Sequence, residues 1–304
     1  MKILVIGGTG HMGTFLVPML LSEGHEVYVG TRGNKISFNS KAFNGAIPIT
    51  LDATSDNDIE ALKTYKFDTV VDFPGHAYRV WSILKNDISH LVACGSLWMF
   101  GYPNQVPTPE KMQNPCRFEV YERRGTEIFE MAEESGKCKA VFTAIMPPNI
   151  AGPGKIPLDL YGDRSAENHK AHMRGEEVIL PDGPEALISP CDAEDIASLF
   201  DLAINNRKAA GGQIFNVGSG DAVTAGELAR IYGEIYGTKI PVKRVSWEKY
   251  KNEVSCNIGD WWHFYAHMCP DFSKAQRLLG YKPKYNTKAT LTRAVEWMKN
   301  EGII

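Results

Sequence analysis

Residues 1–13 read MKILVIGGTGHMG, and this segment indicates the fold class of the whole chain. An apolar run (ILVI) follows one lysine and predicts a buried strand. Three glycines then stand in G-x-x-G-x-x-G spacing, and residues 14–23 (TFLVPMLLSE) have the composition of a helix. A strand, a glycine turn and a helix in this order predict a dinucleotide site, because a pyrophosphate is stabilised by the free N–H groups and positive dipole end of a helix N-terminus.

The glycines of this turn have different expected roles. Gly7 and Gly10 allow the turn and the close approach of the pyrophosphate, and Gly13 lets the helix pack tightly on the strand. A turn that serves packing alone is the alternative. The residues between these glycines that we also expect to bind the cofactor are Thr9, His11 and Met12.

A second strand is expected over residues 26–30, and the residues after it should contact the adenosine ribose. An acid at this point selects NAD, whereas an arginine can pair with the 2′-phosphate of NADP. Residues 27–40 contain no acid, and the charges present are Arg32, which follows Thr31, and Lys35. The sequence therefore favours NADP, with NAD possible. Alternatively, Arg32 is a solvated loop charge or stacks on the adenine of either cofactor.

Further strands are expected over residues 46–51, 68–73, 88–93 and 140–145, alternating with helices. This alternation predicts an α/β fold, a Rossmann-type doubly wound parallel sheet. Ligands of such sheets bind at the carboxyl ends of the strands. The cofactor residues that we expect there are Asp52, Ala53, Phe73, Pro74, Gly75 and Pro147.

The composition changes after residue 150, where residues 151–164 are rich in glycine, proline and aspartate. We expect residues 1–150 to form the dinucleotide-binding domain, rejoined by a strand at residues 213–218. Residues 151–304 should form mostly a smaller substrate domain. Helix starts are expected near Asp192 and at Thr224, and two helices in the last 32 residues.

The composition of the chain argues against several classes of partner. The 304 residues are 43% hydrophobic and 23% charged, with a net charge of −3, so neither nucleic acid nor an anionic membrane is an expected partner. No apolar run reaches the roughly 18 residues of a membrane helix, and no signal peptide is recognised. The six cysteines have no C-x-x-C spacing, which favours a cytoplasmic location. No metal is expected, although two histidine pairs (His169 with His172, His263 with His267) have possible ligand spacing.

Seven motifs in order resemble the extended short-chain dehydrogenase/reductases, the NAD(P)-dependent sugar-nucleotide epimerase/dehydratase family. The resemblance covers essentially the whole chain. It implies a small-molecule substrate, a homodimer and an enzyme acting by hydride transfer on a hydroxyl or ketone of a sugar or sugar nucleotide. The motifs are the glycine turn, Asp52-Ala53, and residues 94–101 (CGSLWMFG), 146–154 (MPPNIAGPG), 191–197 (CDAEDIA), 215–218 (FNVG) and 274–284 (KAQRLLGYKPK).

The family's chemistry uses a tyrosine as general acid/base, a lysine four residues later and a serine or threonine hydroxyl. The resemblance implies Ser96 as the hydroxyl and Tyr121 as the base, but Gly125 stands where the lysine belongs. Arg124 or Arg123 would then supply the positive charge, although arginine is not an equivalent replacement for lysine.

The broken Tyr-x-x-x-Lys pair leaves two further hypotheses. The chain could bind a dinucleotide structurally or as a redox sensor, with little or no dehydrogenase activity. Alternatively, an enzyme of this fold could use another base, such as Glu119 or His76.

Overall fold

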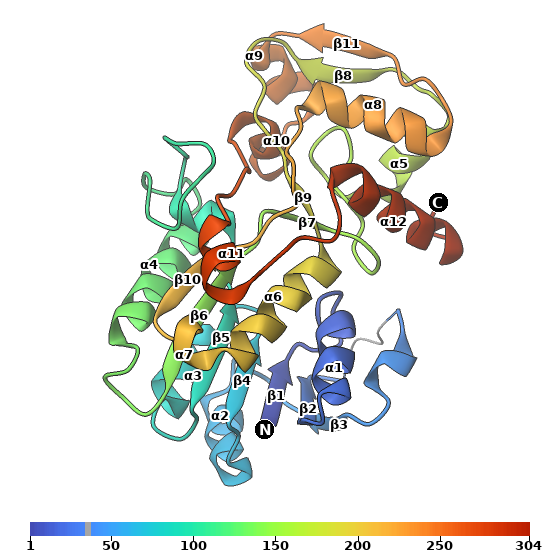
Figure 1. Cartoon of the computed structure of the whole chain (residues 1–304). Coiled ribbons are helices and arrows are strands. Elements are labelled where there is room, and N and C mark those ends of the chain that lie inside the picture. Colours follow the sequence, from blue (N-terminus) through green and yellow to red (C-terminus); the bar gives the residue numbers. More distant parts are fainter. Residues whose placement is uncertain (34–37) are drawn as a thin grey trace.

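The computed structural model describes residues 1–33 and 38–304, so Lys35 lies outside the described residues. Its centre is a seven-stranded sheet in the order β10-β6-β5-β4-β1-β2-β3, with every pair parallel (Figure 1). This order confirms the predicted Rossmann-type sheet. The strands are β1 (Lys2–Ile6), β2 (Glu26–Thr31), β3 (Ile47–Thr50), β4 (Thr69–Asp72), β5 (His90–Cys94), β6 (Val141–Met146) and β10 (Gln213–Asn216).

Both faces of this sheet are buried, because the side chains of its strands alternate between two hydrophobic clusters. In β1, Ile3 and Val5 join one cluster, whereas Leu4 and Ile6 join the other. Helices cover each face. The first cluster includes residues of α1 (Gly13–Ser22), α6 (Ala193–Asn205), α7 (Arg207–Ala210) and α11 (Ser273–Leu279). The second includes residues of α2 (Asp56–Ala61), α3 (Ala77–Leu84) and α4 (Glu119–Glu134).

The chain leaves β1 toward β2 and later returns to pair β4 on the other side of β1. This reversal of strand order is a topological switch point, where ligands of doubly wound sheets bind. Ile6 at the end of β1 is in register with Gly30 of β2 and Asp72 of β4, so the three strands end together. The turns that follow them therefore face one site.

A third hydrophobic cluster lies beyond the carboxyl ends of the strands, in the upper part of Figure 1. It is built around α8 and α12, and it includes Leu158, Tyr250 and Trp261. The elements of this part are β7 (Asn149–Ala151), α5 (Ala166–Met173), β8 (Val178–Pro181), β9 (Pro190–Asp192), α8 (Ala225–Tyr236), β11 (Val242–Val245), α9 (Trp247–Lys249), a π-helical turn (Tyr250–Val254), α10 (Ile258–Tyr265) and α12 (Thr287–Asn300). Strands β7 and β9 pair in parallel, as do β8 and β11.

The expected strands and helices are present, with ends shifted by no more than two residues. Asp192 caps α6 by accepting a hydrogen bond from Glu194 N, and Thr224 caps α8 by accepting one from Glu227 N. Helices α3, α5, α7, α9 and α10, the π-helical turn and the two small sheets were not predicted from the sequence. Three 3-10 turns also went unpredicted, at Ser40–Phe43, Leu62–Tyr65 and Leu97–Phe100.

Candidate active site

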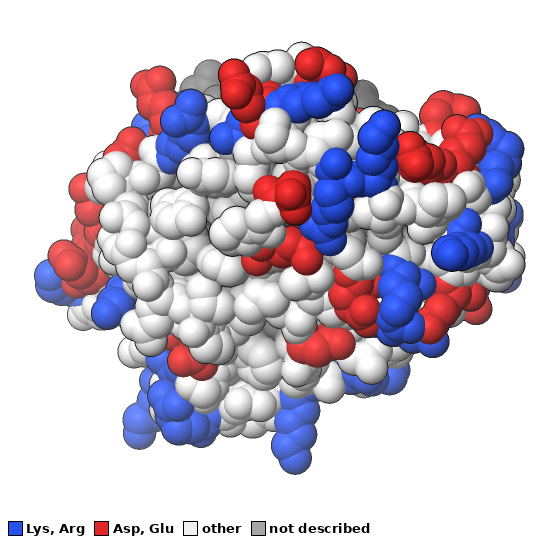
Figure 2. All heavy atoms as spheres, turned by 90° about the horizontal axis from the view of Figure 1, so that it is seen from above, with Lys and Arg blue, Asp and Glu red and all other residues white. Residues whose placement is uncertain are grey.

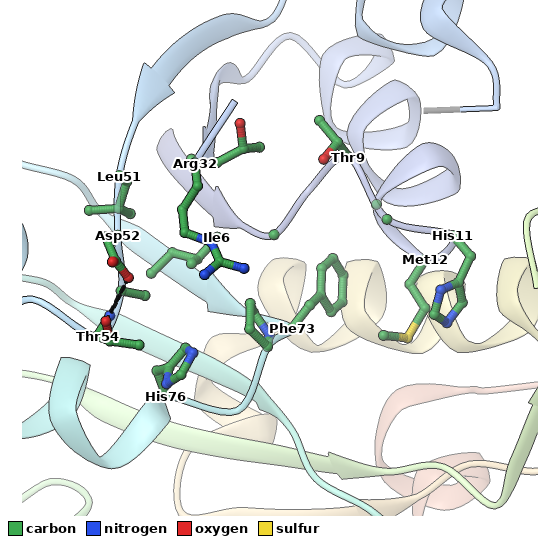
Figure 3. Close-up of a pocket in the computed structure, with 17 residues that line it drawn as sticks. Ile6, Thr9, His11, Met12, Arg32, Leu51, Asp52, Thr54, Phe73 and His76 are labelled. Atoms are coloured by element: carbon green, nitrogen blue, oxygen red, sulfur yellow. Dashed lines mark hydrogen bonds between the residues drawn. The ribbon is translucent and has the colours of Figure 1, made fainter. Parts of the chain in front are cut away.

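A cavity of about 620 Å³ lies at the carboxyl ends of β1, β2 and β4 (Figure 3). Twelve of the predicted cofactor residues line it, whereas Gly75 and Pro147 do not. Its lining residues are Ile6, Gly7, Thr9, Gly10, His11, Met12, Gly13, Gly30, Thr31, Arg32, Leu51, Asp52, Ala53, Thr54, Phe73, Pro74 and His76.

The three glycines of the turn meet different constraints. Gly7 has a φ of +70°, and a Cβ there would lie 2.8 Å from Pro74 Cγ. A Cβ on Gly13 would lie 1.9 Å from the carbonyl oxygen of Gly8, so helix and turn fit only around a glycine. A Cβ on Gly10 would meet only the carbonyl oxygen of Gly7, at 3.3 Å. The protein packs closely on Gly7 and Gly13, while the space beside Gly10 is open to a ligand.

Helix α1 begins at Gly13, beside this cavity. Met12 at its N-cap makes no side-chain capping hydrogen bond, and the first turn contains no acidic residue. The positive end of the helix dipole therefore has no counter-charge in its own first turn. A pyrophosphate fits this end of the cavity.

Arg32 and Asp52 bring opposite charges to the cavity. The guanidinium group of Arg32 projects into it in Figure 3. Asp52 accepts hydrogen bonds from Thr54 N at 3.0 Å and Thr54 Oγ1 at 2.8 Å, which hold the pKa of Asp52 below its usual value. Thr31 Oγ1 accepts a hydrogen bond from Gly33 N at 3.1 Å. Strand β2 therefore ends at Thr31 and is followed by Arg32. The acid of the cavity, Asp52, lies two residues after the end of β3.

A second cavity, of about 340 Å³, adjoins the first and shares four lining residues with it. Ser96, Tyr121, Arg124 and Pro147 all line it, so the predicted catalytic residues meet beside the predicted cofactor site. Its lining residues are His11, Met12, Phe73, Pro74, Cys94, Gly95, Ser96, Trp98, Tyr121, Arg124, Pro147, Pro148, Asn149, Ile150, Lys155, Arg164, His263 and Met268.

Ser96 and Tyr121 reach this cavity from adjacent elements. Ser96 follows β5 and caps the 3-10 turn at Leu97–Phe100, where its hydroxyl accepts a hydrogen bond from Trp98 N at 3.3 Å. Tyr121 lies in the first turn of α4, and its ring centroid is 5.2 Å from that of Trp98. The indole thus packs against the predicted base.

Arg124 occupies the cofactor side of this cavity. A Cβ on Gly75 would lie 1.9 Å from Arg124 Nη2, so the guanidinium group lies directly against the turn after β4. Gly125 is buried, and a Cβ there would lie 2.7 Å from the carbonyl oxygen of Met99. Helix α4 therefore packs too closely on the preceding turn for a lysine at 125. Two other residues weighed for these roles do not line either cavity: the side chain of Arg123 is 71% exposed and ion-pairs with Glu127, and Glu119 is exposed.

Two titratable groups interact electrostatically with Arg124: Asp72, the last residue of β4, and His76, four residues later. Burial raises the pKa of Asp72 to about 6, although Asp72 Oδ2 accepts a hydrogen bond from Gly75 N at 3.0 Å. Burial, followed by the charges of Arg124 and Arg79, lowers the pKa of His76. At neutral pH, His76 is therefore a neutral imidazole at the edge of the cofactor cavity.

The four histidines with metal-like spacing make other contacts. His263 Nδ1 lies 2.8 Å from Asn149 Nδ2, and His169 Nδ1 lies 2.7 Å from Tyr236 Oη. His172 and His267 each accept a hydrogen bond from a backbone amide. Among the described residues, no group of three or more His, Cys, Asp or Glu side chains is suited to holding a metal ion.

Several cavity residues were missed by the sequence analysis. Asn149, Lys155, Arg164 and His263 all line the second cavity, and they come from three separate parts of the chain. Asn149 lies within the motif at residues 146–154, so this motif could have indicated it. No local pattern marks Arg164, and the spacing of His263 to His267 suggested a metal and not this cavity; both residues reach the cavity through the fold beyond the sheet.

A parallel sheet of this order, with a glycine turn and a helix N-terminus facing a cavity, defines a dinucleotide-binding protein of the Rossmann class. The chain belongs to the NAD dependent epimerase/dehydratase family, whose model matches residues 3–83 and 75–218. This membership supports an NAD-dependent enzyme over a structural or sensory use of the dinucleotide.

Three similar proteins illustrate this relationship. A UDP-glucose 4-epimerase of Corynebacterium glutamicum is 22% identical, over 96% of this chain and 93% of its own. The chloroplast stem-loop binding protein of 41 kDa b of Arabidopsis thaliana is 25% identical, over 96% of this chain and 77% of its own. The crystal structure of a UDP-glucose-4-epimerase of Stenotrophomonas maltophila, with bound NAD and formylated UDP-arabinopyranose, has a TM-score of 0.78 and 17% identity, over 99% of each chain.

Proposed function

We propose that this protein is an NAD(P)-dependent oxidoreductase, epimerase or dehydratase acting on a hydroxyl or ketone of a sugar or sugar nucleotide. One observation carries the proposal: the cavity with the glycine turn and the cavity with Ser96 and Tyr121 adjoin and share four lining residues. A substrate carbon in the second cavity would therefore lie next to a dinucleotide in the first. UDP-glucose 4-epimerases among the similar proteins support a sugar-nucleotide substrate.

The cofactor would be held by the first cavity. Gly10 and the start of α1 would receive the pyrophosphate, while Thr31, Arg32 and Asp52 would contact the adenosine end. When bound, the nicotinamide supplies the hydride acceptor or donor.

The proton would be handled by Tyr121 and Ser96. The Tyr121 phenol would exchange a proton with the substrate oxygen, and the Ser96 hydroxyl would hold that oxygen by a hydrogen bond. Arg124, against Gly75, would place a fixed positive charge where the family has lysine. It would stabilise the tyrosinate electrostatically while remaining protonated itself.

Replacing Tyr121 tests this assignment. Tyr121→Phe removes the proton carrier and keeps the ring, so turnover should fall by about 10²–10⁴-fold. Tyr78→Phe is the matched control, because Tyr78 is 46% exposed on α3. Full activity in Tyr121→Phe would sink the assignment and direct attention to His76, which lines the cofactor cavity.

NADP is our proposed cofactor in preference to NAD, and Arg32 carries this choice. Parallel titrations with NADPH and NADH, followed by nicotinamide fluorescence, should show tighter NADPH binding. Arg32→Ala should remove the preference, whereas Arg79→Ala should not, since Arg79 ion-pairs with Asp56 and does not line the cavity. A preference for NADH in the wild type would reject the role of Arg32.

The proposal also covers the domain organisation, the oligomeric state and the cellular location. Residues 1–150 with the strand at 213–218 would form the cofactor domain, and the rest mostly the substrate domain. We also propose a homodimer and a cytoplasmic location, the latter supported by six free cysteines. Among the described residues, no helix has the length and apolarity to cross a membrane. Figure 2 shows acidic and basic side chains interspersed on one face, without the basic track that nucleic acid would require there.

A further inference from the structure

Arg164 is a half-buried cation that has no carboxylate at ion-pair distance within residues 1–33 and 38–304. It lies between β7 and α5, lines the second cavity, and donates from Nη1 to the carbonyl oxygen of Ile156. Burial lowers its pKa to about 10, so the guanidinium group is still protonated at neutral pH. Among residues 1–33 and 38–304, it makes no ion pair and donates no other hydrogen bond. A guanidinium group has five N–H donors, so most of its capacity is unused.

Asp163, the residue before Arg164, is exposed, and the nearest buried acid in the sequence is already occupied. Asp159 is fully buried, and its two carboxylate oxygens accept four hydrogen bonds that shape the loop. The donors are Tyr161 N, Asp163 N, Ser165 N and Asn168 Nδ2. Asp159 attracts Arg164 only through space and does not contact it as an ion pair.

The second cavity as a whole is positive. Arg124, Lys155 and Arg164 line it, and none of its lining residues is an aspartate or glutamate. The histidine beside Arg164 adds no charge, because burial lowers the pKa of His263 to about 3. Side chains of one charge sign lining a partly closed cavity favour a ligand of opposite charge.

The two arginines have different neighbours in this cavity. Arg124 lies against Gly75 and interacts electrostatically with Asp72, on the cofactor side. Arg164 interacts electrostatically with Tyr121 and His263 and does not line the cofactor cavity. Arg164 is therefore placed near the predicted base while being separate from the predicted cofactor contacts.

We propose that Arg164, assisted by Lys155, binds an anionic substituent carried by the sugar itself, near the carbon that reacts. The inference rests on the proposed function and narrows its substrate class to acidic sugars, as carboxylates or phosphates. A planar carboxylate or a phosphate can accept two parallel hydrogen bonds from one guanidinium group, which a neutral sugar hydroxyl cannot. The negative charge of the ligand would also offset the free-energy cost of removing water from the Arg164 guanidinium group.

The diphosphate of a sugar nucleotide offers the same chemistry, so the test uses pairs that differ only on the sugar. UDP-glucuronate is compared with UDP-glucose, and glucose 6-phosphate with glucose, by calorimetric titration with and without saturating NADPH. In at least one pair the acidic member should bind at least tenfold more tightly. Arg164→Gln should reduce that preference to within about twofold, and Lys155→Gln should reduce it less.

Arg174→Gln is the matched control, because Arg174 is 61% exposed and ion-pairs with Glu176 outside the cavity. Arg164→Lys is measured beside Arg164→Gln, with thermal unfolding of each. It keeps the charge and should retain part of the preference, which a purely structural role for Arg164 does not predict.

Equal binding within both pairs, or a preference that survives in folded Arg164→Gln, would overturn the inference. If Arg164→Gln weakened the binding of UDP-glucose and UDP-glucuronate equally, Arg164 would be assigned to the diphosphate, and the inference would be overturned as well. Failure of the proposed function has a different signature: no nicotinamide cofactor binds the wild type, or Tyr121→Phe remains fully active. The charge preference is measured in either case.

Discussion

The guanidinium group of Arg124 lies where a side chain on residue 75 would begin, with Nη2 at 1.9 Å from the ideal Cβ position of Gly75. Gly75 also has a φ of +89°, so an L side chain is disfavoured there for two reasons. With Tyr121 as the proposed base, the family's lysine position falls on Gly125, four residues later, whereas Arg124 stands three residues after Tyr121. Both spacings lie on the same side of a helix, which lets the cation reach the site from a different residue.

Removing this cation should impair the reaction. Arg124→Ala should lower kcat by about 10²–10³-fold, the range for loss of one preorganised electrostatic group. Arg124→Lys should recover part of the rate, since it keeps the charge but loses the planar fork. Arg123→Ala, one residue away and exposed, should leave kcat within about twofold. Equal losses in the Arg123 and Arg124 variants would contradict a specific role for Arg124.

Lysine cannot simply be restored at residue 125. Even Gly125→Ala places a Cβ 2.7 Å from the carbonyl oxygen of Met99, and relieving this contact requires α4 to move. We expect the free energy of unfolding to fall by about 1–3 kcal/mol, as for other overpacked sites. Urea unfolding measures it. Gly220→Ala is the control, because no heavy atom lies within 4 Å of its Cβ position, and it should change stability by less than about 0.5 kcal/mol.

A substitution at Gly10 should weaken cofactor binding without unfolding the protein. Gly10→Ala adds a Cβ whose tightest contact is the carbonyl oxygen of Gly7 at 3.3 Å, so stability should change by less than about 1 kcal/mol. Cofactor affinity should nevertheless fall at least tenfold, because the methyl group occupies the pyrophosphate approach. Gly13→Ala should instead disrupt the fold, since its Cβ would lie 1.9 Å from Gly8 O. Unchanged cofactor affinity in Gly10→Ala would place the pyrophosphate elsewhere.

His90 should make stability depend on pH. It is fully buried between β4 and β6, and burial lowers its pKa to about 3. Thr143 Oγ1 donates to the carbonyl oxygen of Ala210 and therefore accepts from His90 Nε2, and His90 Nδ1 has no hydrogen-bond partner among the described residues. The folded state thus holds His90 neutral while the unfolded state takes up a proton below about pH 6.5.

Stability from this group is therefore present above pH 6.5 and is lost as the pH falls toward 4, by about 1.4 kcal/mol per pH unit. His90→Gln should reduce the slope of unfolding free energy against pH by about one proton in this window. Comparing variant with wild type cancels His172 and His263, which act in the same direction, and Asp72, which acts in the opposite one. An unchanged slope would mean that the imidazole is protonated in the folded protein.

The sequence was sufficient for the sheet because its signals are local. The apolar run of β1, the glycine spacing and the side-chain caps at Asp192 and Thr224 each depend on a few neighbouring residues. Helix α3 was missed because it follows Pro74-Gly75 without a recognisable cap, and His76 at its N-cap makes no side-chain hydrogen bond. The short strands of the upper part pair over only three or four residues, too few for a pattern.

The site was predictable where it follows a strand and not where it depends on tertiary packing. Ser96 follows β5 directly, and the cofactor turn follows β1. By contrast, Arg164 and His263 are far apart in the chain and meet Tyr121 only because the third hydrophobic cluster places the Arg164 loop and helix α10 over the sheet edge. The clash that excludes lysine at 125 is equally invisible in the sequence, since it depends on how closely α4 approaches Met99.

The outer strand β10 also determines when this protein can finish folding during its synthesis. Residues 213–216 pair with residues 143–146 of β6, so the strands made first have an unpaired edge until residue 216 has left the ribosome. Helix α11, which contacts β10, is translated later still. A nascent chain halted after β6 would therefore present Thr143–Met146 as an open, apolar edge, available for pairing with other chains. The central sheet is begun first but is completed only after β7, α5, β8 and β9 of the upper part have been translated.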